Sequence, residues 1–112
     1  MGLLETILRA RTARQLQRLA LLVAERSLDG VRHRLHPMAH SMTPAEARGY
    51  VRARAAAVVT HEVDHALSVE GRIPTWGRGE LLRQATGHVV LQLSRELVAL
   101  PPSQIRLQRR AA

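Results

Sequence analysis

Residues 42–71 read MTPAEARGYVRARAAAVVTHEVDHALSVEG, and this stretch decides the fold class. Its first residues carry the signals of a helix start: a capping hydroxyl, a proline at the first helical position and a carboxylate three residues after the cap, at Thr43, Pro44 and Glu46. Nothing breaks the helix until Gly71, although Gly49 weakens it slightly. The stretch therefore predicts one long helix over residues 44–70.

Two further long helices are predicted on either side of this one. The first covers about residues 3–29 and is expected to end at the Asp29-Gly30 pair, a typical C-terminal signal. The third covers about 79–100, where two prolines follow. No segment shows the alternation of a strand. The expectation is an all-α bundle of three long helices, with one domain over 1–100 and a basic, flexible tail over 101–112.

The apolar residues are aliphatic, which suits close helix packing. The chain of 112 residues has no Phe, one Trp and one Tyr. In the third helix one face collects Leu82, Val89, Val90, Leu93, Leu97 and Leu100. The middle helix has two apolar faces, the first with Ala47, Val51 and Val58, continued by His61 and His65, and the second with Val59, Val63 and Leu67. Residues 16–24 are apolar almost all round, so a homo-oligomer or a protein partner is expected to complete the bundle.

Charge favours an acidic partner. All 17 basic residues are arginine and the formal net charge is +8, which suits nucleic acid or an acidic protein. The absence of Lys, Phe and Asn, whose codons are AT-rich, predicts a GC-rich, bacterial genome, which would account for part of the arginine content. The residues expected to contact such a partner are Arg11, Arg14, Arg18, Arg48, Arg52, Arg106, Arg109 and Arg110. No helix-turn-helix spacing or stacking aromatics support sequence-specific readout, so contact with nucleic acid would be non-specific. Solvated helix faces are the alternative.

One motif points to metal chemistry. Residues 61–65 read HEVDH, and two His four residues apart on a helix can share a zinc ion while the adjacent Glu activates a bound water. The segment resembles the active-site helix of zincin-type metallopeptidases and, still more closely, the last motif of peptide deformylases. That resemblance implies His61 and His65 as zinc ligands and Glu62 as catalytic base.

The resemblance covers about eight residues, because the chain lacks the cysteine ligand and the glycine-rich first motif of deformylases. A third ligand is needed, and Glu96 is the first candidate, ahead of His88 and Glu80. The alternatives are a polar cluster on a solvated helix face and an inter-subunit metal site that uses the same His pair.

The remaining sequence features narrow the class of protein. With no Cys there are no disulfides or thiolate ligands, which is compatible with a cytoplasmic protein. The apolar run LALLVA at 19–24 is too short for a transmembrane segment. The sequence thus favours a small, basic, helical binding or scaffold protein, oligomeric and without a cofactor. The alternative is a small zinc-dependent hydrolase built on His61, Glu62 and His65.

Overall fold

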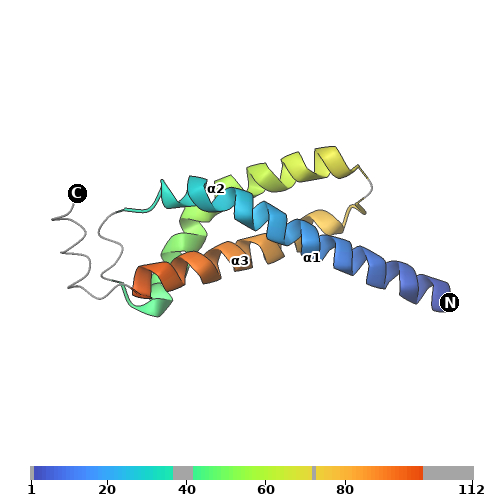
Figure 1. The fold of residues 1–112 in the computed structure, drawn as a ribbon, viewed down its shortest axis with the longest axis horizontal. Coiled ribbons are helices and arrows are strands. Elements are labelled where there is room, and N and C mark those ends of the chain that lie inside the picture. The colour runs from blue at the N-terminus through green and yellow to red at the C-terminus, as the bar shows by residue number, and fades with distance from the viewer. Residues whose placement is uncertain (1, 37–41, 72, 100–112) are drawn as a thin grey trace.

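The computed structural model describes residues 2–36, 42–71 and 73–99. They form three helices, α1 (Leu3–Arg32), α2 (Pro44–Glu70) and α3 (Gly77–Ala99), which confirms the predicted all-α three-helix bundle. α2 runs antiparallel to α1, and α3 returns in the direction of α1 (Figure 1). The expected tail at 101–112 lies outside the described residues.

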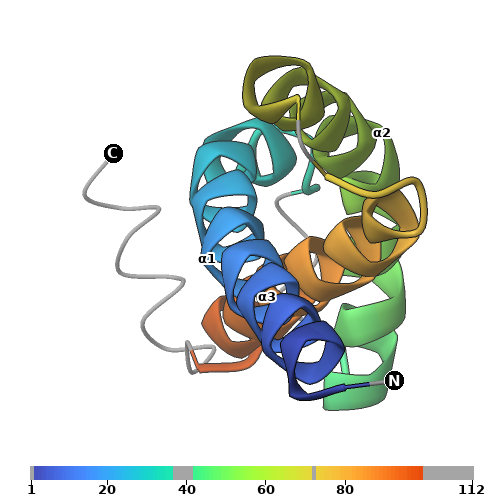
Figure 2. The ribbon, with the colours of Figure 1, turned by 90° about the vertical axis from the view of Figure 1, so that its right-hand side faces the viewer.

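The core is built from rows of small and medium side chains that recur every four residues. In α2 the row is Ala47, Val51, Ala55, Val59 and Val63, and in α3 it is Leu81, Ala85, Val89, Leu93 and Leu97. Helices that interlock through such rows cross at a marked angle instead of lying parallel. Figures 1 and 2 show this oblique crossing. Without Phe, the small residues let the helix axes approach closely.

The two apolar faces expected for α2 are in fact one. Val51, Val59 and Val63 are all fully buried, whereas Val58 is only partly buried. The difference arises because a four-residue repeat advances beyond one full helical turn, so the buried row winds around the helix. His61 and His65 therefore do not continue a buried face.

α1 continues past the position where it was expected to end. The sequence predicts a stop at Asp29-Gly30, but the helix runs to Arg32 and fully buries Val31. Gly30 is not a left-handed cap, since among the described glycines only Gly71 has a positive φ. A Cβ at Gly30 would lie 3.2 Å from Cγ1 of Val58. This glycine serves the close approach of α1 and α2.

The ends of α2 match their sequence signals. The Thr43 hydroxyl oxygen accepts a hydrogen bond from the Glu46 backbone N–H at 3.3 Å, and the hydroxyl lies 2.9 Å from the Glu46 carboxylate. Gly71 ends the helix with a φ of 65°, and its N–H donates to the Leu67 carbonyl. These local signals fix where α2 begins and ends, whereas the buried row decides that Val63 is the residue of the HEVDH motif that faces the core.

Candidate binding surface on the outer face of α1

The HEVDH motif lies on the exposed side of α2. His61 and His65 are exposed, while Val63 between them is fully buried. Both oxygens of Asp64 accept hydrogen bonds from the Arg78 guanidinium, at 2.9 and 3.2 Å. These bonds hold the pKa of Asp64 below its ordinary value. The acidic residue before the second His thus ties α2 to the start of α3.

Two of the three candidates for a third metal ligand form hydrogen bonds with other side chains, and the remaining one is exposed on α3. Glu96 accepts hydrogen bonds from Arg32 at 2.7 and 3.2 Å, which joins α3 to the end of α1. Glu80 accepts from Arg83 and Gln84, which lowers its pKa to about 2. His88 is exposed beside α1.

Within residues 2–36, 42–71 and 73–99, no group of three or more His, Asp and Glu side chains could hold a metal ion. The zinc site stays a prediction that lacks a third ligand in this part of the chain. Glu62 is partly buried, and its side chain forms no ion pair in this part of the chain.

The predicted arginines of α1 do come together. Arg11, Arg14 and Arg18 line a shallow recess of about 330 Å³ with Gln15. Their spacing of three and four residues sets them on one face of the helix, opposite the buried Leu16 and its neighbours. In the described part of the chain none of the three forms an ion pair. Glu70 lines a neighbouring recess with Arg18, so the three guanidinium groups form a row with an excess of positive charge, which attracts anionic groups.

The other predicted arginines lie elsewhere. Arg48 and Arg52 are exposed near the start of α2, which follows the C-terminal end of α1, so they form a separate group from the α1 row. Arg106, Arg109 and Arg110 lie outside the described residues.

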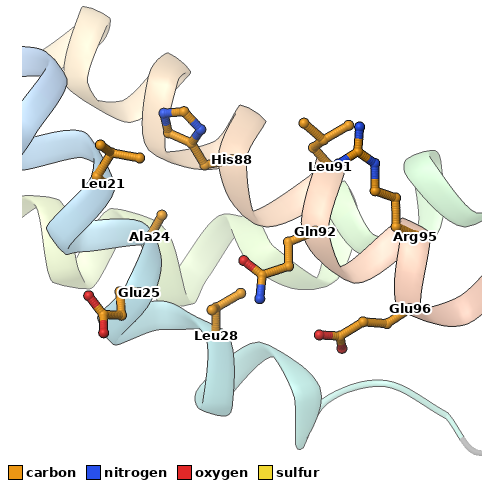
Figure 3. Close-up of a pocket in the computed structure, with 9 residues that line it drawn as sticks. All are labelled: Leu21, Ala24, Glu25, Leu28, His88, Leu91, Gln92, Arg95 and Glu96. Atoms are coloured by element: carbon orange, nitrogen blue, oxygen red, sulfur yellow. The ribbon is translucent and has the colours of Figure 1, made fainter.

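A groove between α1 and α3 lies further along α1 than the arginine row, toward the C-terminal end of the helix. Its volume is about 790 Å³, and its walls combine leucines with polar side chains (Figure 3): Leu21, Ala24, Glu25, Leu28, His88, Leu91, Gln92, Arg95 and Glu96. Leu21 is 56% exposed and its neighbour Leu22 is 41% exposed. Sequence reasoning did not identify the groove. The available signal was that these leucines share the helix face of the arginines.

The sequence matches no family model, no curated protein and no solved structure. No helix in the described part of the chain is both long and apolar enough to cross a bilayer. Function must therefore be argued from the side chains of this chain alone.

Proposed function

We propose that this chain is a non-enzymatic binding protein that docks an acidic protein surface on the outer face of α1. The observation that carries the proposal is the row of Arg11, Arg14 and Arg18, which lines one recess without an ion-pair partner in the described structure. The planar guanidinium group of arginine can bind one carboxylate through two parallel hydrogen bonds. The exposed Leu21 and Leu22 next to the row supply the apolar contact that a protein partner needs.

A titration with a labelled Glu- and Asp-rich peptide tests this proposal. The variant Arg11→Gln/Arg14→Gln/Arg18→Gln is expected to lose most of the affinity. The matched control Arg34→Gln/Arg54→Gln/Arg83→Gln removes the same charge from exposed positions and is expected to keep it. Binding should weaken as salt rises from about 50 to about 200 mM, because exposed charges are screened. Equal losses in both variants would show that only net charge matters.

Nucleic acid is the competing partner, and a mixed-sequence duplex belongs in the same experiment. With a net charge of +8, the chain should have some attraction for any polyanion. If the duplex binds through the α1 row and the peptide does not bind, the partner of this surface is nucleic acid and not an acidic protein. Binding lost equally in both variants would contradict a specific surface for either partner.

The zinc hydrolase is less well supported. His61 and His65 have the spacing of zinc ligands, but Glu96 is engaged by Arg32. Such a site needs a ligand from another copy or from outside the described residues. Metal analysis of tag-free protein tests it: zinc in equal amount to protein, lost in His61→Ala/His65→Ala, would revive the zinc hypothesis.

A further inference from the structure

The outer face of α1 is basic at one end, apolar in the middle and acidic at the other end. Reading along the helix, the exposed face presents Arg14 and Arg18, then Leu21 and Leu22, then Glu25 and Asp29. The steps of three and four residues keep these side chains on one face, turned away from the core. In Figure 3 the Glu25 carboxylate points away from the side chains of α3. Basic, apolar and acidic groups thus follow one another on a surface that α2 and α3 leave open.

Two copies of this face have complementary charges when they lie antiparallel, because the basic end of each then meets the acidic end of the other. If a second α1 lies antiparallel with residues 21 and 22 at the crossing point, position 18 faces position 25 and position 14 faces position 29. Arg18 then meets Glu25 of the other copy, and Arg14 meets its Asp29. Each pair occurs twice because the arrangement has two-fold symmetry. The leucines meet at the centre, flanked by ion pairs on both sides.

We propose that the acidic surface docked on the outer face of α1 is the segment with Glu25 and Asp29 in α1 of a second copy of this chain, which lies antiparallel about a two-fold axis beside Leu21 and Leu22. The inference rests on the proposed function, since it names the partner of that surface. Leu21 also lines the groove between α1 and α3, where Leu28 and Leu91 extend the apolar surface around it. A parallel pair would set Arg18 against Arg18 and Glu25 against Glu25, which like-charge repulsion disfavours.

Within one copy, Asp29 is the only one of these four charges that is paired in the described part of the chain. Arg18 and Glu25 are seven residues apart, or about 10 Å along the helix, too far for an ion pair with each other. Neither forms an ion pair in the described part of the chain. Asp29 contacts Arg32 through Oδ1 only, at 3.2 Å, and its side chain is 88% exposed. All these groups remain accessible to a second copy.

Charge reversal tests the pairing by sedimentation equilibrium at micromolar concentrations. The unchanged protein should show a monomer–dimer equilibrium. Arg18→Glu and Glu25→Arg should each raise the dissociation constant roughly tenfold, because symmetry doubles each repulsion. The double variant Arg18→Glu/Glu25→Arg should return it to near the original value. Arg54→Glu, which reverses one exposed charge on α2, should leave it unchanged. A monomer at every concentration, or a double variant as weak as the single ones, would overturn the proposal.

A cysteine pair tests the direction of the helices. The chain has no Cys, so a single substitution gives one reactive site per copy. Leu21→Cys should be joined to its counterpart by a short crosslinker. Ala10→Cys should not, because the two positions lie about 35 Å apart along an antiparallel pair. Crosslinking at both positions would indicate a parallel dimer and contradict the proposal.

The two proposals fail in different ways. A monomeric protein that still binds the acidic peptide through the α1 arginines would remove the second copy as partner and keep the docking surface. A protein that neither dimerises nor binds the peptide would remove both. Restored dimerisation in the double charge reversal would support both, since it requires carboxylates to meet these arginines.

Discussion

The two halves of α1 are helical for different reasons. Residues 16–31 hold seven buried side chains, including Leu16, whereas residues 3–15 hold none. Leu3 and Leu4 are 81% and 72% exposed, and Figure 1 shows this end of α1 extending past the other helices. Packing stabilises the second half. The first half depends on the helix propensity of its Leu, Ala and Arg residues and on continuation from the packed half.

The largest contrast is expected from matched leucine truncations in the two halves. Leu16→Ala should lower the free energy of unfolding by about 2–5 kcal/mol, because the side chain is 1% exposed and its removal leaves a cavity. Leu8→Ala, at a site 53% exposed, should change it by less than about 0.5 kcal/mol. Urea unfolding of both variants measures the difference. A comparable loss at Leu8 would mean that the first half is packed against something in solution.

A smaller change in stability is expected at Gly30, where the packed half of α1 touches α2, and Gly87 of α3 serves as the comparison. Gly87→Ala should stabilise the protein by about 0.5–1 kcal/mol, because a Cβ there meets nothing and alanine favours a helix. Gly30→Ala should lose that gain, since its Cβ would press on Val58. Adding Val58→Ala should relieve the pressure, so the benefit of Ala at position 30 should reappear in that background. Thermal unfolding compares the variants, and equal gains at Gly30 and Gly87 would argue against a tight contact.

The smallest effect is expected in the unpacked half. Ala13→Gly lowers local helix propensity by about 1 kcal/mol but should change the global unfolding free energy by less than about 0.5 kcal/mol. Far-UV circular dichroism should show some loss of helix, and amide exchange should speed up only in residues 6–13. Ala20→Gly, at a fully buried site, should reduce global stability by more than 1 kcal/mol, roughly its propensity loss plus a buried methyl. Similar global effects would remove the distinction between the halves.

The sequence predicted the features that depend on local chemistry. The start and end of α2 follow from Thr43, Pro44 and Gly71, because caps and left-handed glycines act through the nearest turn. Gly30 was misinterpreted as a helix end since its role depends on Val58 in another helix. A glycine that permits close packing and one that ends a helix look alike in sequence.

In the candidate site, too, the features within one helix could be predicted and the contacts between helices could not. The arginine row could be predicted, because it needs only the helical repeat within α1. The groove between α1 and α3 could not be predicted, since Leu91 and His88 reach it from α3. The engagement of Glu96 by Arg32 also joins residues 64 positions apart in the chain. Contacts between distant segments depend on how the helices cross, which the spacing within one helix does not give.

The four-residue rows of the core have a consequence for insertions and deletions. One residue added inside α2 would turn everything after it by about 100°, moving Val59 and Val63 off the buried face and exposing them. Four added residues would turn it by only about 40°, close to the next position in the row. A change of four residues in helix length should therefore be tolerated far better than a change of one, which restricts how the lengths of these helices can vary.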